Sequence, residues 1–384
     1  MRSRPGPGPI IRVARQLERE RMEAKPVVDE LRHSIQDRWD SDVPAAWKTV
    51  GFVHELTAAA SDLTERDART SAALAQFAIV VITGIPEDAY PAAVRLEAEA
   101  TAWKELASAH RYVSEYEAAI RALNAADRCL GKAPALGYDR AVLQFARALV
   151  FSDMQRFDEA DALLFETVRA FAAFDDRRRL GQCLLLKGMI EQRRGLLVEA
   201  CMTYDETIVV IRDTGDLHSL ASVYNNLAQA RIALGHTNAA VSALHDAFAI
   251  FSDLAMPAEI ARVRWVLGRV VLGSGQSRQA HDVLAEARMT FIGLRMPEEA
   301  GLTGLELAEA CIALGRDDRA RMIIEEVAAD FVRAGLNDRA LTALAYLRDV
   351  LPSGRGREAV RHVRTYIEQL RHDPLRAFAP LPVD

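Results

Sequence analysis

Residues 216–251 read DLHSLASVYNNLAQARIALGHTNAAVSALHDAFAIF, and this stretch decides the fold. Apolar residues recur at helical spacing in both of its halves, at Leu220, Val223, Tyr224, Leu227, Ala228 and Ile232 and again at Ala240, Leu244, Ala247 and Phe251. Gly235 separates the halves at the position where a residue in the left-handed region would end a helix. The stretch therefore predicts a pair of antiparallel helices joined by a tight turn.

The same unit recurs every 40 residues along the chain. The interval separates Gly195, Gly235, Gly275 and Gly315; Ala160, Ala200, Ala240, Ala280 and Ala320; and Phe171, Ile211, Phe251, Phe291 and Phe331. Small residues mark one site in each first helix, at Ala107, Ala148, Gly188, Ala228, Gly268 and Ala308, and would let paired helices approach closely. A fixed period of this length indicates stacked copies of one supersecondary unit.

Two copies resemble the tetratricopeptide repeat pattern W-x2-L-G/A…A-x3-F/L-x2-A. They comprise Trp103, Leu106, Ala107, Ala119, Leu123 and Ala126, and Tyr224, Leu227, Ala228, Gly235, Ala240, Leu244 and Ala247; weaker copies are anchored at Ala160, Ala200, Ala280, Ala320 and Ala359. The period exceeds the usual ~34 residues, so the chain looks like the long-helix variety of bacterial signalling and regulatory proteins. The resemblance implies an all-α fold, a right-handed superhelical solenoid of antiparallel helix pairs.

The expected organisation has four parts: a disordered tail over 1–9, an N-terminal helical cap over 10–90, seven repeats over 91–372 and a flexible tail over 373–384. The cap is expected to hold one or two charged amphipathic helices over 11–38, interrupted at Pro26, and a divergent helix pair at 45–62 and 68–82. End repeats need a polar outer face, which the charged cap would supply.

Composition and charge narrow the class of partner. The chain has 384 residues, a formal net charge of −6 and 27% charged residues, so nothing overall favours nucleic acid. Its N-terminus lacks the apolar core of a secretory signal, and no apolar run approaches the ~18 residues of a membrane helix. The four cysteines are widely spaced without a CxxC pair. The expected location is the cytoplasm, with no membrane association.

Motifs for chemistry are absent from the sequence. His54-Glu55 resembles the start of a zinc-binding HExxH motif, but Ala58 stands where the second histidine would be. Residues 273–278 contain two glycines but lack the ending of a phosphate-binding loop. We therefore expect no catalytic residues, no metal and no cofactor, and we predict that the chain is not an enzyme.

The C-terminal region is the best candidate for a nucleic-acid contact. Its arginines are Arg355, Arg357, Arg361, Arg364, Arg371 and Arg376. Because no helix-turn-helix pattern accompanies them and acidic residues dilute the charge, a solvated capping helix is the favoured interpretation.

The resemblance implies that first helices line an inner wall, where a partner would lie. Counting −6, −3 and +1 from each small site gives Val142, Phe145, Leu149; Gln182, Leu185, Met189; Ser222, Asn225, Gln229; Arg262, Trp265, Arg269; and Leu302, Leu305, Glu309. The candidate groove is the apolar set Phe145, Leu149, Leu185 and Met189, the polar set Asn225, Asn226 and Gln229, and the stripe Arg262, Trp265 and Arg269. Tryptophan and arginine are enriched at binding hot spots.

Each set has an alternative interpretation. Gln144, Arg147 and Lys187 fall where the repeat normally buries a residue, so the helices could be rotated and the apolar set could be core. Trp265 could be packed, and Asn225 with Gln229 could be solvated surface. The leading hypothesis is a non-catalytic scaffold that binds a protein or peptide on its concave face. The alternative is a peptide- or signal-responsive regulator that acts through a separate output partner.

Overall fold

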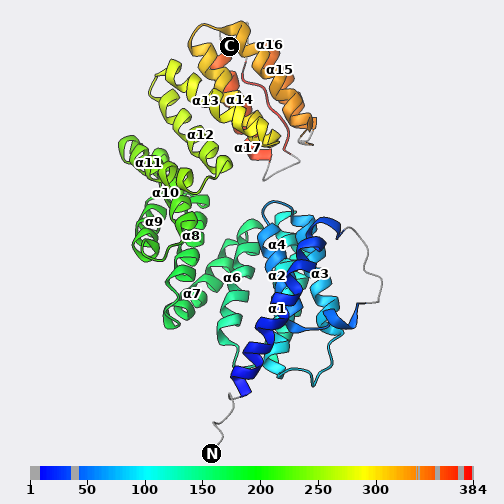
Figure 1. Ribbon diagram of the computed structural model, residues 1–384. Coiled ribbons are helices and arrows are strands. Elements are labelled where there is room, and N and C mark those ends of the chain that lie inside the picture. Colours follow the sequence, from blue (N-terminus) through cyan, green and yellow to red (C-terminus); the bar gives the residue numbers. More distant parts are fainter. Residues whose placement is uncertain are drawn as a thin grey trace, which may run out of the picture. The chain divides into compact units, whose positions relative to one another are not determined.

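The structure is a computed structural model that describes residues 9–35, 43–333, 335, 338–350, 355–370 and 376–382 (Figure 1). Within these ranges every regular element is a helix. The helices form two compact units, the first ending at Ile190 and the second beginning at Glu191. The expected all-α architecture of consecutive helix pairs is confirmed.

The first unit holds eight helices of the described chain and one short 3-10 turn. They are α1 (Pro9–Ser34), η1 (Ala45–Trp47), α2 (Val50–Leu63), α3 (Ala68–Thr83), α4 (Ala92–Tyr112), α5 (Tyr116–Gly131), α6 (Gly137–Asp153), α7 (Phe157–Ala173) and most of α8 (Arg177–Arg193). α4 contacts both α2 and α6, so the three helices form one layer. α3 packs against α2 and α4, α5 against α4 and α6, and α7 against α6.

The second unit continues the pairing. It comprises α9 (Leu197–Ile211), α10 (Leu217–Ala233), α11 (Thr237–Asp253), α12 (Pro257–Gly273), α13 (Ser277–Gly293), α14 (Pro297–Ala313), α15 (Asp317–Arg333), α16 (Asp338–Val350) and α17 (Gly356–Leu370). α10, α12 and α14 form one layer and α11, α13 and α15 pack against it.

The turns show that the 40-residue period is built from two equal halves. From Gln155 onward, residues with positive φ occur every 20 positions, at Gln155, Asp175, Gly195, Gly215, Gly235, Ala255, Gly275, Arg295, Gly315 and Gly335. Gly235 has φ +80°, and the N–H of His236 donates to the carbonyl of Arg231 at 2.8 Å, which satisfies a terminal carbonyl of α10. The left-handed end predicted at Gly235 is confirmed.

The periodic residues form the core between layers. The alanines at the 40-residue interval are fully buried, and Phe171, Ile211, Phe251, Phe291 and Phe331 are at most 1% exposed. At the small site Gly268, an added Cβ would lie 2.6 Å from Leu284. The small residue is therefore required by the close approach of α12 to α13.

Two helix expectations in the N-terminal part were wrong in detail. α1 runs through Pro26 without interruption. Proline has no N–H to donate to the carbonyl of Met22, but both residues lie on the exposed face, so water can donate to that carbonyl instead. The helix expected over 45–62 is divided into η1 and α2, because the Thr49 side chain caps α2 by accepting from the N–H of Phe52 at 3.1 Å. Residues 36–38 of the first expected helix lie outside the described chain.

The last helix pair packs differently from the pairs before it. α16 contacts α15, whereas α17 contacts both α16 and α14. The second helix of this pair therefore lies on α14, the first helix of an earlier pair. Residues 376–382 follow as an extended segment that contacts α16 and α17; the flexibility expected for 373–384 stays a prediction.

Candidate peptide-binding surfaces

An amide with an open hydrogen-bonding position lies on α10. Asn225, Asn226 and Gln229 are each half-buried. The Oδ1 atom of Asn225 is fully buried and has no hydrogen-bond partner among the described residues. Buried polar atoms are nearly always paired, and leaving one unpaired costs about 1–3 kcal/mol. α10 therefore carries an unsatisfied acceptor, which an external N–H donor could reach only if the Asn225 side chain turned outward.

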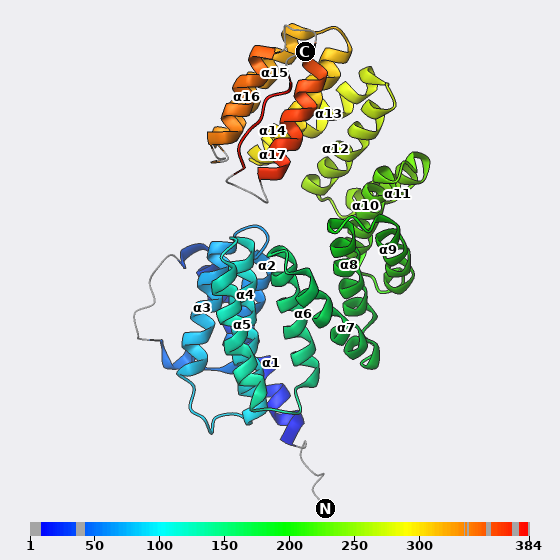
Figure 2. The ribbon, with the colours of Figure 1, turned by 180° about the vertical axis from the view of Figure 1, so that it is seen from behind.

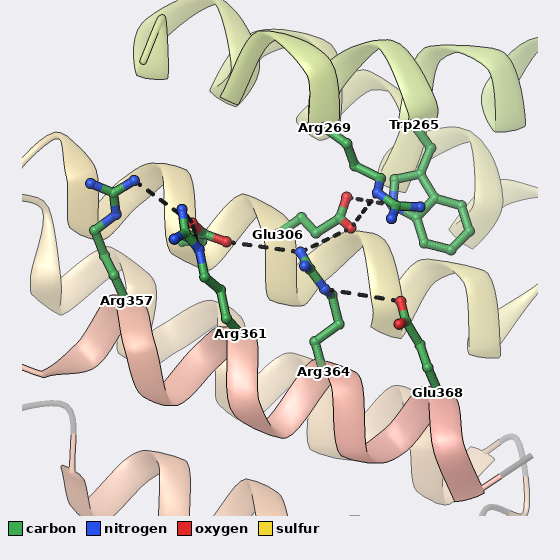
Figure 3. Close-up of polar contacts among 8 residues, drawn as sticks. Trp265, Arg269, Glu306, Arg357, Arg361, Arg364 and Glu368 are labelled. Atoms are coloured by element: carbon green, nitrogen blue, oxygen red, sulfur yellow. Dashed lines mark hydrogen bonds and ion pairs between the residues drawn. The ribbon is translucent and has the colours of Figure 1, made fainter. Parts of the chain in front are cut away.

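The arginine–tryptophan stripe of α12 is already paired within the chain, and Figure 3 shows this for Trp265 and Arg269. Trp265 Nε1 donates to Glu306 Oε2 at 2.6 Å, and Arg269 Nε lies 3.2 Å from Glu306 Oε1. The ring of Trp265 also packs edge-on against Phe291, with centroids 6.1 Å apart. Arg262 pairs with Glu259 and, at 3.2 Å, with Glu299. The environment of Trp265 therefore fits the interpretation that this side chain is packed within the chain better than the interpretation that it is an exposed anchor for a partner.

α17 covers the neighbouring face of α14 with three arginines. Arg364 lies 3.2 Å from Glu306, while Arg361 donates to Glu309 at 2.6 Å and Arg357 lies 3.7 Å from the same carboxylate. Leu302, Leu305 and Glu309, which were expected on the inner wall, are at most 1% exposed. The arginines of α17 thus lie on the acids of α14, while Arg357 and Arg361 keep about half of their side-chain surface exposed, at 46% and 54%.

Glu306 has a strongly perturbed acidity because it is fully buried. Burial raises its pKa to about 7, and this effect outweighs the guanidinium groups of Arg269 and Arg364 and the hydrogen bond from Trp265, which all lower it. The carboxyl group therefore exchanges its proton near neutrality. Sequence reasoning missed Glu306. The signal was there, because Glu306 and Glu309 lie on a first helix and Arg357, Arg361 and Arg364 share one face of a later helix, so the two sets could pair.

The apolar candidates lie in the first unit and are half-buried. Phe145 and Leu149 pack against the hydrophobic cluster that contains Phe171. Leu185 and Met189 are also half-buried, on α8. Leu149 additionally lines a cavity of about 210 Å³ between α2, α4 and α6. The apolar set is therefore partly core and partly accessible.

The cavity beside Leu149 has polar walls that sequence reasoning missed. Ser61 and Ser108 line it at the same +1 position as Leu149, relative to Ala60 and Ala107. Arg111, also on the wall, pairs with Asp153 at 2.7 Å. Both serines could have been predicted by taking the residue directly after the small site in α4 and α2, as was done for Leu149 in α6.

The helix phase at α6 is explained by an ion pair. Arg147 occupies a position that the repeat normally buries, and it donates to Asn124 of α5 at 2.9 Å and pairs with Asp127. Gln144 reaches the same Asp127 at 3.5 Å. Ala148 remains fully buried. Because Asn124 and Asp127 of α5 bind Gln144 and Arg147, these polar residues can lie at the contact between α5 and α6, and α6 need not be rotated to expose them.

Within the described ranges, no three histidine, cysteine, aspartate or glutamate side chains are grouped so that they could hold a metal ion. Among the helices described, none is long and apolar enough to cross a membrane.

Comparisons with known proteins identify the fold. No family model and no curated protein matches the chain. The apo form of RapI matches with a TM-score of 0.61 at 11% identity, covering 95% of this chain and 97% of RapI. A signal-transduction ATPase with a tetratricopeptide repeat sensor, from Pyrococcus horikoshii, matches with a TM-score of 0.61 at 13% identity, covering 92% of this chain and 54% of that one.

A third match is the Rap conjugation gene regulator of plasmid pLS20 in complex with the Phr* peptide. Its TM-score is 0.54 at 12% identity, and the match covers 93% of this chain and 98% of the regulator. At these identities the likeness shows the fold alone. The resemblance to tetratricopeptide repeat proteins is confirmed at that level.

Proposed function

We propose that this chain is a non-catalytic scaffold that binds an extended segment of a partner protein, with Asn225, Asn226 and Gln229 of α10 as the principal polar contacts. The observation that carries the proposal is the buried Oδ1 of Asn225, which has no partner in the described chain. An acceptor held in this state costs stability, and a peptide N–H that drew the half-buried Asn225 side chain outward would recover that cost.

The spacing of the two amides on α10 suits an extended backbone. Side chains four residues apart on a helix face are about 5–6 Å apart, and Asn225 and Gln229 have this separation in sequence. Alternate residues of an extended peptide are about 6.6 Å apart. Because each amide group can both donate and accept, the pair can bind the N–H and C=O groups of a peptide without reading its side chains.

Proteins of the same fold support the proposal that the chain binds a peptide. The Rap conjugation gene regulator was solved with the Phr* peptide bound, and another match has a repeat sensor attached to an ATPase. These matches also favour the second candidate function, a regulator that changes shape on binding a peptide and acts through a separate partner. The four cysteines are free thiols, which fits action in the cytoplasm.

Panning a random heptapeptide display library against the full-length protein tests the site. Selected peptides would then be titrated against Asn225→Ala, Gln229→Ala and the control Asn238→Ala, whose side chain is exposed on α11. We expect about a fivefold loss of affinity for each of the first two variants, since one hydrogen bond contributes ~1 kcal/mol. Asn238→Ala should bind as the wild type does. Equal affinities for all four proteins would refute the α10 site.

Small-angle scattering with and without a selected peptide separates the two candidate functions. A scaffold whose binding surface is preformed keeps its radius of gyration, whereas a peptide-driven regulator changes it. The control is the Asn225→Ala protein at the same peptide concentration. A change in its radius of gyration would not depend on binding at α10.

A further inference from the structure

An extended segment of the chain, residues 376–382, lies along the face shared by α16 and α17. Figure 2 shows it as a dark red trace that runs between these two helices. The segment reads Arg-Ala-Phe-Ala-Pro-Leu-Pro. It has no regular secondary structure and gains no hydrogen bonds from a helix or sheet of its own.

The two helices hold this segment mainly by its backbone. The Tyr366 hydroxyl donates to the carbonyl of Arg376 at 2.8 Å, and His362 Nε2 lies 2.7 Å from the carbonyl of Ala379. At the far end, the hydroxyl of Tyr346 accepts from the N–H of residue 381 at 3.1 Å. The fourth contact is made by Arg355, which donates to the carbonyl of residue 382 at 2.6 Å. Contacts of this kind recognise an extended backbone rather than a particular sequence.

One side chain of the segment fills an aromatic pocket. The ring of Phe378 lies 4.9 Å from Tyr366, 5.2 Å from Tyr346 and 5.6 Å from His362, measured between ring centroids. Aromatic pairs at these separations are attractive beyond the burial of their surface. Leu381 adds a smaller apolar contact with the core of the second unit. Phe378 is therefore the anchor.

We propose that the α16–α17 face is a peptide-binding site for extended, proline-containing segments with a phenylalanine anchor, and that residues 376–382 occupy it in cis. Two features of the occupant fit such a ligand. Pro380 and Pro382 have no N–H to leave unpaired, and proline favours an extended chain, so little conformational entropy is lost on binding. The site is separate from α10, so the proposal does not depend on the function assigned there.

Occupancy in cis controls access to the site. A tethered segment acts at an effective concentration that is often in the millimolar range. An external segment binds only to the fraction of molecules whose site is vacant, so its apparent affinity falls by that fraction. Weakening the cis contact should therefore strengthen the binding of the same segment supplied in trans.

Fluorescence anisotropy with a labelled synthetic peptide tests this directly. The probe has the sequence of residues 376–382 and is titrated into the full-length wild type, into Phe378→Ala and into Leu381→Asp, two variants that weaken the cis contact independently. We expect both variants to bind the probe at least tenfold more tightly than the wild type. A second probe with alanine in place of phenylalanine should bind the variants at least tenfold more weakly.

Two controls complete the design. The double variant Phe378→Ala/Tyr346→Phe keeps the aromatic ring but removes the hydroxyl that accepts from the backbone, and it should lose part of the gained affinity. Circular dichroism at 222 nm checks that each variant keeps its helix content. Equal binding of the probe to wild type and to both folded variants would overturn the proposal, and so would equal binding of the two probes.

Discussion

Two first helices of the second unit, α10 and α14, hold equivalent places in the repeat but use their faces differently. On α10, Asn225 keeps a buried acceptor without a partner. On α14, Glu306 and Glu309 are buried, and each is paired with arginines of α17. The residues of α10 that stand 80 positions before Glu306 and Glu309 are Asn226 and Gln229, and both are half-buried. The same repeat positions are thus paired with arginines on α14 and partly accessible on α10.

The difference shows what covers an inner face in a repeat array. Each pair in a repeat array buries a face against the next pair. Here α17 takes the place of the next helix on α14, and its arginines match the acids beneath it (Figure 3). A face is left for an external partner only where no helix of the chain covers it.

The largest expected effect comes from breaking the covered face. Glu306→Ala removes the carboxylate that pairs with Arg269 and Arg364 and accepts from Trp265. The variant leaves the Trp265 N–H and the Arg364 guanidinium without this acceptor, and removing one member of a buried charged cluster costs about 3–5 kcal/mol. Urea unfolding followed by circular dichroism should show a loss of this size. The control Glu325→Ala, at an exposed position on α15, should stay within ~0.5 kcal/mol of the wild type, and equal midpoints for both variants would contradict the assignment.

The next effect is a pH dependence of the covered face. The pKa of Glu306 is raised from 4.5 to about 7, so the folded state binds this proton more tightly than the unfolded chain does. The stabilisation is complete below pH 4.5 and is lost as the pH rises through about 7, with a total on the order of 3 kcal/mol. Glu306→Gln cannot ionise and lacks this dependence.

The measurement is the difference in unfolding free energy between wild type and Glu306→Gln at pH 5, 6, 7 and 8. The wild type should lose stability relative to the variant as the pH increases. A difference that is constant across the series, or one of opposite sign, would show that the carboxyl group is ionised throughout.

The smallest expected effect concerns the open face, and it has the opposite sign. Asn225→Leu removes a buried acceptor that has no partner, so it should raise the free energy of unfolding by about 1 kcal/mol. Trp265→Phe removes a donor from Glu306 and should lower it by about 1–3 kcal/mol. Thermal or urea unfolding of both variants sharpens the contrast between the two helices. If Asn225→Leu proved the more destabilising of the two, the Asn225 side chain would stabilise the fold itself, and the assignment of an open contact to α10 would be wrong.

Much of the fold followed from spacing alone. The buried alanines and the phenylalanine row at 40-residue intervals mark the second helix of each pair, and Gly235 marks a turn. The 20-residue half-period was hidden, because Ala255 and Arg295 adopt positive φ where glycine would be expected. Non-glycine residues tolerate this conformation at a modest cost, so composition does not reveal every turn.

The candidate site was predictable only in part. Position in the repeat placed Asn225 and Gln229 on a first helix, and their half-burial agrees with an inner location. It did not predict that Trp265 would donate to Glu306, because that contact joins residues 41 positions apart on different helices. Nor did it predict the contacts of Phe378 with α16 and α17.

The sequence by itself determined the helices, their pairing and the residues between the layers, because periodic spacing and small side chains act locally and repeat unchanged. Only the tertiary structure decided which inner positions are free and which are paired. That outcome depends on where α17 and the segment after it lie, and burial of charges and amides is a property of the whole neighbourhood, which no single repeat contains.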